Sequence, residues 1–342
     1  MGIADNVRSH PFTTLLGVLL LIVLLFLAYA LYAPNHFADV AQKTFFVSRG
    51  ETFAQVVDSL AAQGLLRSRT LFEGVARLLG GTDRVQVGRY VFASGVSNAQ
   101  LFLALRGGEG SSLIMVTIPE GLRSRSQARI FARALGIDSS RYLDLVHNPG
   151  FAASLRIKDT SLEGYLFPDT YAFQWQQDEE EIIRRMIEQF RKFYTDSLAE
   201  RGEELGWTVG QVLTLASIVE GEAVREDERS VIAGVYWNRL RRGMKLEADP
   251  TIQFIVNERP RRLRYMDLKV DHPYNTYLRP GLPPGPVNNP GRASIIAALY
   301  PAQHNYIFFV ANGRGGHWFA STYAEHMRNV RQFRRYRAHQ QS

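Results

Sequence analysis

The chain has no cysteine, and this absence excludes several kinds of chemistry. Its 342 residues contain no thiol that could form a disulfide, bind zinc as a thiolate or act as a nucleophile. Metal binding or covalent catalysis would therefore depend on His, Asp, Glu, Ser, Thr or Lys. The same absence leaves the redox compartment undetermined.

Several catalytic motifs are missing as well. The eight histidines include no HExxH pair, and no GxxxxGK[ST] phosphate loop is present. Ser217 lacks the flanking glycines of a nucleophile elbow, so we interpret it as a small core residue. We therefore predict neither a bound metal nor a cofactor.

Acidic residues are fewer than basic ones, with 33 Asp and Glu against 40 Lys and Arg. Much of the excess lies in residues 261–269 and 328–337. Such clusters can meet nucleic acid, anionic lipid or an acidic polymer, but neither carries a DNA-binding or RNA-binding motif. We interpret them as solvated surface and predict no nucleic-acid partner.

A long uncharged run lies near the N-terminus. Residues 12–33 are 22 consecutive residues without a charge, which is long enough to cross a bilayer as a helix. A cleaved signal peptide is the competing interpretation, because Ala28-Tyr29-Ala30 resembles a cleavage site. The run is longer than an ordinary signal-peptide core, so we predict a cytoplasmic N-terminus over residues 1–11 and an uncleaved anchor over 12–33.

After the anchor, strand and helix patterns alternate in short units. Residues 44–66 and 114–137 each have the pattern of a strand, a tight turn and a helix, and 86–110 supply another strand and helix. These patterns predict an α+β fold. We expect a small LysM-like module over 44–155 and a second, mixed α+β domain over 156–342.

One helix of the second domain carries the candidate catalytic residue. Thr208 and Gln211 have capping-box spacing, so this helix should begin at about residue 209. At about 100° per residue, Glu220 falls within the apolar stripe and Glu222 lies about 160° away. We expect Glu222 at the solvent and Glu220 among apolar neighbours that raise its pKa, as a general acid at a glycosidic oxygen requires.

Glu220 has a structural interpretation too, as one half of a buried ion pair with an arginine such as Arg239 of the next helix. A glycosidase would also need a second carboxylate, as a base for water or as a nucleophile. The candidates for it, none singled out by spacing, are Glu163, Asp169, Glu247 and Asp249.

Five sequence blocks match a known family in the same order. They are LEGYLFPDTY (162–171), LASIVEGEA (215–223), VIAGVYWNRLRRGMKLEADPTIQF (231–254), YNTYLRPGLPPGPVNNPGRASIIAALYPA (274–302) and YIFFVANGRGGHWFASTYAEH (306–326). On these blocks the chain resembles the endolytic murein transglycosylases of the MltG or YceG-like type. It departs from the family pattern at Gly221, where lysine is frequent, and at Glu247, where glutamine is more frequent. The second departure puts any role for residue 247 in doubt.

The resemblance implies a single-pass enzyme of the inner membrane, with its catalytic domain in the periplasm. In a bacterium with one membrane, that domain would face the wall. It implies a lyase that cuts nascent peptidoglycan strands, limits their elongation and works beside peptidoglycan synthases, the penicillin-binding proteins. Cleavage would fall between N-acetylmuramic acid (MurNAc) and N-acetylglucosamine (GlcNAc).

The resemblance also implies that Glu220 is the catalytic glutamate. It would protonate the glycosidic oxygen and then draw the proton from the muramyl C6 hydroxyl, which closes a 1,6-anhydro ring. Because the substrate supplies its own nucleophile, a single glutamate suffices. Further candidates from the matching blocks, for substrate binding and for stabilising an oxocarbenium-like transition state, are Asn238, Asp249, Gln253, Tyr277 and Asn288.

Two alternative functions stay open. A hydrolytic muramidase would release reducing muramic acid ends in place of anhydro ends. A membrane-tethered glycan-binding scaffold would use the LysM-like module to recruit synthases, and Glu220 would then be structural.

Overall fold

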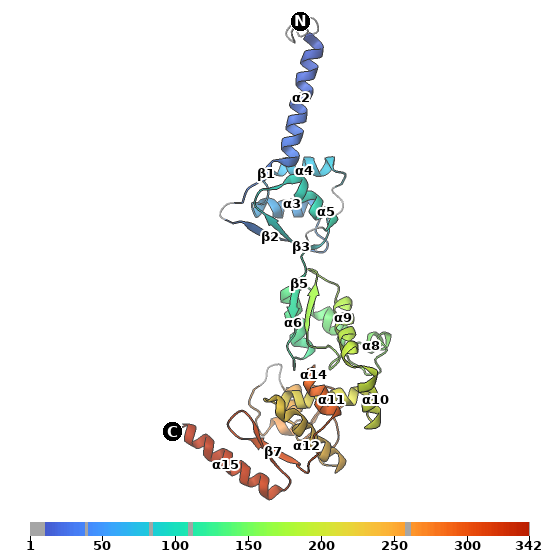
Figure 1. The fold of residues 1–342 in the computed structure, drawn as a ribbon, viewed down its shortest axis with the longest axis vertical. Coiled ribbons are helices and arrows are strands. Elements are labelled where there is room, and N and C mark those ends of the chain that lie inside the picture. The colour runs from blue at the N-terminus through green and yellow to red at the C-terminus, as the bar shows by residue number, and fades with distance from the viewer. Residues whose placement is uncertain (1–10, 38–39, 82–84, 109–111, 257–260, 342) are drawn as a thin grey trace. The chain divides into compact units, whose positions relative to one another are not determined.

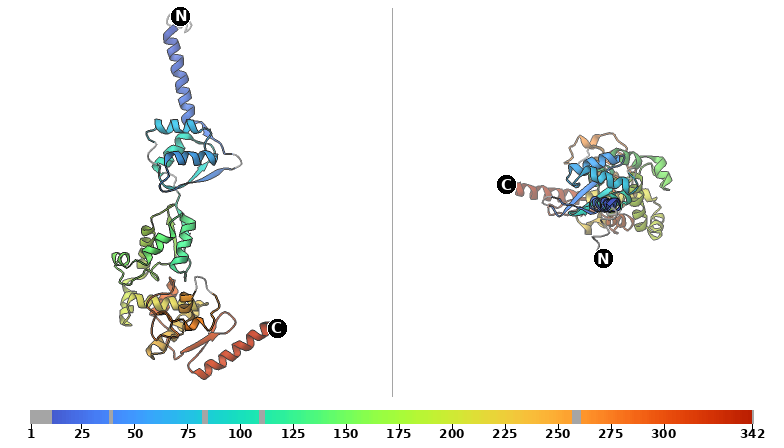
Figure 2. Two further views of the ribbon diagram at one scale, coloured as in Figure 1. Left: turned by 180° about the vertical axis from the view of Figure 1, so that it is seen from behind. Right: turned by 90° about the horizontal axis from the view of Figure 1, so that it is seen from above.

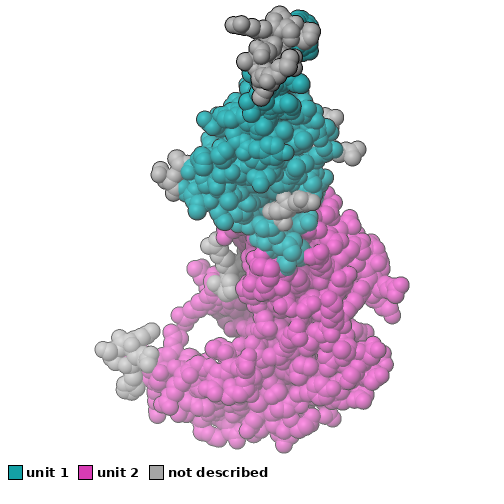
Figure 3. Space-filling view, turned by 45° about the horizontal axis from the view of Figure 1, so that its top comes forward, with its two compact units in different colours: residues 1–114, 172–176 teal, residues 115–171, 177–342 magenta. Residues whose placement is uncertain are grey.

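The computed structural model describes residues 11–37, 40–81, 85–108, 112–256 and 261–341 (Figure 1, with two further views in Figure 2). The chain divides into two compact units, coloured separately in Figure 3. Unit 1 comprises Met1–Ile114 with Ala172–Gln176, and unit 2 comprises Met115–Tyr171 with Gln177–Ser342. The module predicted over 44–155 therefore spans parts of both units, since residues 115–155 belong to unit 2.

Unit 1 begins with the long apolar helix α2 (Pro11–Tyr32). Most of its large apolar side chains from Phe12 to Leu27 are exposed, and the helix is long and apolar enough to cross a membrane. Near its C-terminal end the helix is fastened within the unit, where Asn98 Nδ2 donates to the Ala30 carbonyl at 2.9 Å. The helix predicted over 12–33 is confirmed, and it is compatible with a single-pass anchor.

The remainder of unit 1 is a small α+β core. Strand β2 (Gln42–Val47) pairs antiparallel with β3 (Gly88–Ala93), so that Phe45 lies opposite Tyr90, and both are buried. The short strands β1 (Pro34–Asn35) and β4 (Val96–Ser97) pair in the same way. The helices of this unit are α3 (Phe53–Ala62), α4 (Arg69–Leu78) and α5 (Asn98–Gly107). The α+β class is confirmed here, while the likeness to LysM stays a prediction.

Strands β5 (Ile114–Thr117) and β6 (Thr170–Phe173) pair in a two-stranded sheet, of which Met115–Thr117 and Thr170–Tyr171 belong to unit 2. Between these strands lie α6 (Ser124–Leu135), α7 (Ser139–Val146) and α8 (Pro149–Ser154), and α9 (Glu179–Phe193) follows them. The later helices are α10 (Asp196–Glu204), α11 (Val209–Glu222), α12 (Arg229–Arg241), α13 (Asp249–Val256) and α14 (Arg292–Leu299). The chain then forms a hairpin of β7 (Phe308–Ala311) and β8 (His317–Ala320), and α15 (Tyr323–Gln341).

Helix α11 occupies the centre of unit 2. Its N-terminus is the predicted capping box, in which Thr208 Oγ1 accepts from the Gln211 N–H and Gln211 Oε1 accepts from the Thr208 N–H. Eight consecutive residues, Val212 to Val219, are buried, because α10, α12, α13 and α14 all pack against this helix. Over this stretch the helix has no side that faces solvent, although Gln211 and Gly221 near its ends are exposed, so the single apolar stripe expected from the sequence is incomplete.

Candidate active site

Glu220 lies near the C-terminal end of α11, just beyond the buried run. Its Oε2 accepts from the Gly291 N–H at 3.0 Å, and its Oε1 is 3.1 Å from Arg229 Nη1. Only 8% of the Glu220 side chain and 12% of the Arg229 side chain are exposed. The expected apolar surroundings are therefore wrong, because a cation and a backbone donor meet this carboxylate.

The arginine suggested from the sequence as a partner, Arg239, lies elsewhere. Arg229 is the first residue of α12, and Arg239 is about three turns further along the same helix. Arg239 donates to the Ile307 and Leu246 carbonyls at 2.6 and 2.9 Å and pairs with Glu247 at 3.0 Å. It fastens the backbone around β7, whereas Arg229 is the partner of Glu220.

A second carboxylate, that of Glu120, lies beside Glu220. It follows strand β5, and a methyl group added at Gly291 would stand 1.9 Å from its Cδ. Burial and then the negative charge of Glu220 raise the pKa of Glu120, while the charge of Arg229 and a hydrogen bond from the Arg292 N–H act in the opposite direction. The sequence interpretation missed this residue, and its only local signal was an acidic side chain at a strand end.

Two glycines allow the carboxylates to come together. Gly121 has φ of +72°, and a Cβ there would lie 3.3 Å from Cγ of Glu220. Gly291 is the N-cap residue of α14, and its N–H and the next one each bind one of the two carboxylates. The positive end of the α14 dipole thus faces both negative charges.

The loop before α14 is tied by hydrogen bonds both to the segment after Glu120 and to helix α11. Gly121 donates its N–H to the Asn289 carbonyl at 2.9 Å, and Asn289 returns a bond to the Leu122 carbonyl at 3.0 Å. Asn288 Nδ2 donates to the Ser217 carbonyl at 2.8 Å, and the Ser217 hydroxyl accepts from the Val287 N–H at 2.9 Å. Ser217 is thus a buried positioning residue within α11, in agreement with the interpretation as a core residue.

Glu222 is only partly exposed, so the expectation that it lies at the solvent is wrong. The Tyr236 hydroxyl donates to its Oε1 at 2.9 Å, and the Asp249 N–H donates to the same carboxylate. Burial, followed by the charge of Asp249, raises the pKa of Glu222 to about 7. The physical reason is the packing of α12 and α13 on the side of α11 that was read as exposed.

Two of the predicted substrate-binding residues lie beside Glu222. The Tyr277 hydroxyl donates to Asp249 Oδ1 at 2.7 Å, and the pKa of Tyr277 is raised by burial first and by this hydrogen bond second. At the start of α13, Pro250 packs so closely on Gly221 that a Cβ there would be 2.6 Å from the proline ring. Asp249 and Tyr277 thus lie near the C-terminal end of α11, on the Glu222 side.

Two more of the five predicted binding residues, Asn238 and Gln253, bind the backbone of loops. Asn238 Nδ2 donates to the His304 and Tyr306 carbonyls at 2.7 and 3.0 Å, which fixes the approach to β7. Gln253 exchanges hydrogen bonds with the backbone of Arg261. The structure therefore brings Asp249, Tyr277 and Asn288 near the end of α11, whereas Asn238 and Gln253 hold loops.

The remaining candidates for a second carboxylate have other partners. Glu163 is buried against Ser124 and Asn289, Asp169 binds Gln189, and Glu247 pairs with Arg239. Within the described part of the chain, no group of three or more His, Asp or Glu side chains is arranged to hold a metal ion. The groups gathered at this site are therefore the carboxylates of Glu220 and Glu120, the Arg229 guanidinium, and two backbone N–H donors, those of Gly291 and Arg292.

Known proteins resemble the chain over most of its length. A model of the YceG-like family matches residues 45–332. An endolytic murein transglycosylase of Bacillus subtilis (strain 168) is 30% identical over 295 residues, which cover 82% of this chain and 81% of that protein. One of Streptococcus pneumoniae (strain ATCC BAA-255 / R6) is 27% identical over 321 residues, covering 84% of this chain but 57% of the longer relative.

A solved structure is similar in fold. The crystal structure of a yceG-like protein from Listeria monocytogenes matches with a TM-score of 0.61 and 28% identity. The match covers 84% of this chain and 98% of the other. It therefore includes most of both units.

Proposed function

The chain belongs to the YceG-like family, and from this premise we propose that it is an endolytic murein transglycosylase with Glu220 as its acid and base. The relatives that carry this name act, by that name, on murein. We assign this chain the same polymer and the cleavage of nascent strands between MurNAc and GlcNAc, which leaves 1,6-anhydro ends and limits strand elongation.

The observation that carries the proposal is the position of the Glu220 carboxylate. Arg229 and the Gly291 N–H fix it at the N-terminus of α14, and Glu120 stands beside it. Burial and then the negative charge of Glu220 raise the pKa of Glu120, so the carboxyl beside Glu220 takes up a proton more readily than an isolated one. A proton kept at the site is what the first step requires.

The reaction balances without water. Glu220 gives a proton to the oxygen that links MurNAc C1 to GlcNAc C4, and the C1–O bond breaks as the GlcNAc hydroxyl leaves. The muramyl O6 then attacks C1, and its proton returns to Glu220. Arg229 and the Gly291 N–H stabilise the carboxylate in the interval when it has lost its proton.

Location and partners follow the same proposal. Helix α2 anchors the chain in the inner membrane, with both units on the periplasmic side, or facing the wall in a bacterium with one membrane. Peptidoglycan synthases that make the strands are the expected partners, and a LysM-like module in unit 1 would hold glycan. The apolar and exposed surface of α2 supports the anchor.

A hydrolytic muramidase is the second candidate function, and one observation favours it. Glu120 supplies the second carboxylate that a hydrolase would use as a base for water or as a nucleophile. The two reactions differ in their product ends, so product analysis separates them.

The test is digestion of purified peptidoglycan by the full chain in detergent, with mass spectrometry of the products. We expect anhydro-muropeptides from the wild type and from Glu222→Gln, a matched control two residues away, and none from Glu220→Gln. Water-added ends would establish the muramidase instead. An absence of products from the wild type would leave the glycan-binding scaffold. Circular dichroism must show that each variant is folded.

A further inference from the structure

A pocket of about 720 Å³ lies in unit 2, beside the N-terminal end of α11. Its size is within the range of about 300–1,000 Å³ that is typical of small-ligand sites. The chain between α8 and β6, helices α9 and α10, and the start of α11 all contribute to its lining. We call this feature the aromatic pocket, after Tyr165, Phe190, Tyr194 and Trp207, which line it.

The rings of the aromatic pocket are held in place by their neighbours. The Phe190 ring stacks on that of Tyr194, with centroids 5.3 Å apart, and meets that of Tyr165 edge-on at 5.4 Å. Trp207 packs against Trp237 with ring centroids 4.6 Å apart. Rings fixed in this way offer apolar surface to a ligand with little further loss of side-chain freedom.

Charged side chains of both signs also line the aromatic pocket. Arg156, Lys158 and Arg191 contribute positive charge, and Asp159 and Glu203 contribute negative charge. All except Asp159 are exposed, so they lie where the pocket opens to solvent. Together these groups can donate to and accept from hydroxyl and amide groups, but their mixed charge does not select an ion of either sign. The lining therefore suits an uncharged polar ligand.

A carboxylate of the chain itself lies against the N-terminal end of α11. The Tyr165 hydroxyl donates to Asp159 Oδ2 at 2.5 Å, and a Cβ at Gly210 would collide with the same carboxylate. The positive end of the α11 dipole thus already faces a negative charge. An anionic ligand would compete with Asp159 here, so the pocket does not favour a peptide carboxylate.

The Tyr194 hydroxyl is buried, and none of the described residues forms a hydrogen bond with it. It lies close to Gly202, where an added Cβ would be 3.3 Å away. A buried hydroxyl without a partner is unfavourable. Because the same residue lines the aromatic pocket, a hydroxyl or amide group of a ligand bound there would offset this cost.

The aromatic pocket is separate from the proposed site of cleavage. Val209, which lines the pocket, begins α11, and Glu220 lies eleven residues later on the same helix. At 1.5 Å per residue the two are about 17 Å apart. A ligand in this pocket would therefore not occupy the position of the reacting sugar.

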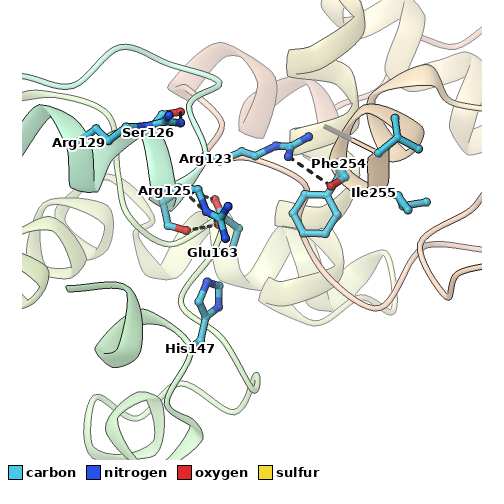
Figure 4. Close-up of a pocket in the computed structure, with 10 residues that line it drawn as sticks. Arg123, Arg125, Ser126, Arg129, His147, Glu163, Phe254 and Ile255 are labelled. Atoms are coloured by element: carbon cyan, nitrogen blue, oxygen red, sulfur yellow. Dashed lines mark hydrogen bonds between the residues drawn. The ribbon is translucent and has the colours of Figure 1, made fainter. Parts of the chain in front are cut away.

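Another pocket, of about 460 Å³, lies at the start of α6 (Figure 4). Arg123, Arg125 and Arg129 line it, and each of them already interacts with other groups of the fold. Glu163, which also lines it, is bound by Ser124. Because these polar groups have partners within the fold, we assign no ligand to this pocket.

We propose that the aromatic pocket binds a sugar of a murein strand, away from the bond that is cleaved. This inference rests on the proposed function, which supplies the strand. A pyranose ring has a face of C–H groups, which packs on aromatic rings, and its edge carries hydroxyl and acetamido groups, which bind charged side chains. The pocket offers both kinds of surface. Binding there raises the affinity of the enzyme for long strands and takes no part in bond cleavage.

Hydrogen exchange locates the bound sugar. Exchange of full-length Glu220→Gln in detergent is followed by mass spectrometry with and without a hexamer of N-acetylglucosamine, which is uncharged and has no peptides. We expect the hexamer to slow exchange in residues 187–194 and 203–210, which include lining residues of the pocket. Unchanged exchange in both segments would overturn the proposal. So would protection by free stem peptides and not by the hexamer, which would assign the pocket to a peptide.

A variant that fills the pocket tests its effect on cleavage. Ala199 lines the pocket from α10, whereas Glu200 beside it is exposed and outside the lining, so Ala199→Trp is compared with Glu200→Trp. We expect Ala199→Trp to abolish the protection and to lower kcat/KM on long strands about 10-fold, mainly through KM. Strands of two disaccharides, which offer few sugars beyond the cleaved bond, should be cut as by the wild type. Glu200→Trp should behave as the wild type on both.

Equal losses on long and short strands, or wild-type behaviour of a folded Ala199→Trp, would overturn the proposal. Urea midpoints show whether the variant is folded, and if it is not, the exchange experiment decides alone. The two proposals fail separately. Protection of the pocket by the hexamer in a protein whose wild type cuts no murein would reject the proposed function and keep the pocket. Cleavage without such protection would keep the function and reject the pocket.

Discussion

Glu220 and Glu222 stand two residues apart at the end of one helix, and their carboxylates meet different surroundings. Glu220 faces Arg229, the N-terminus of α14 and a second carboxylate, Glu120. Glu222 faces the Tyr236 hydroxyl and the start of α13. At Glu220, a cation and a backbone N–H can stabilise the negative charge that the carboxylate acquires when it gives up a proton during a reaction. The surroundings of Glu222 favour a carboxyl that keeps its proton. The difference shows that what packs against each side of α11 decides the chemistry of its glutamates.

The largest expected effect is on catalysis by Glu220. Glu220→Gln keeps the shape of the side chain but removes the proton that it must give and take, so the rate should fall by about 10³-fold. Glu222→Gln keeps the acceptor for Tyr236 and should retain most of the activity. Initial rates of anhydro-end formation measure both. Similar losses in the two variants would remove the distinction between the glutamates.

Arg229 should matter for stability as well as activity. Arg229→Ala leaves a nearly buried carboxylate without its cation, and we expect the free energy of unfolding to fall by about 3 kcal/mol. The Arg225–Asp227 pair is exposed, so Arg225→Ala should leave the urea midpoint unchanged. Equal urea midpoints for the two variants would mean that the Arg229–Glu220 ion pair does not contribute to the stability of the fold.

The packing of two carboxylates against Gly291 gives a third test. In Gly291→Ala the new methyl group would occupy the place of the Glu120 carboxyl carbon, 1.9 Å away, so Glu120 must move out of the site. We expect activity to fall about 10-fold or more, because the carboxyl group beside Glu220 is displaced from the site. Gly74→Ala, in α4 with open space around it, is the control. Full activity in Gly291→Ala would show that Glu120 takes no part.

The smallest effect concerns the pH dependence of stability. The pKa of Glu222 is about 7 in the folded chain and should return to its ordinary value near 4.5 on unfolding. The folded state therefore binds more protons between these values, and stability present below about pH 4.5 is lost as the pH rises towards 7. Urea midpoints at pH 5 and pH 7 should differ less in Glu222→Gln than in the wild type. Equal differences would mean that Glu222 is not the group responsible.

Much of the local structure was predictable. The capping box of Thr208 and Gln211 and the apolar helix over 12–33 depend on residues close in the sequence, and both are present. The apolar periodicity predicted helix α11 but not which elements pack around it. The reason is that an amphipathic pattern assumes that one face of the helix meets water. Along Val212–Val219, eight consecutive residues are buried, so no face of this stretch meets water.

By itself, the sequence determined the α+β class, the apolar N-terminal helix, the cap of the central helix α11 and the blocks that mark the family. Each of these depends on neighbours one or two turns apart, whose relation is fixed by helix or strand geometry. Only the tertiary structure decided that Glu120 lies beside Glu220, a hundred residues later, that Arg229 and not Arg239 is its cation, and that Glu222 is covered. These contacts depend on which surfaces pack together in the folded chain, and a local sequence pattern does not predict that packing.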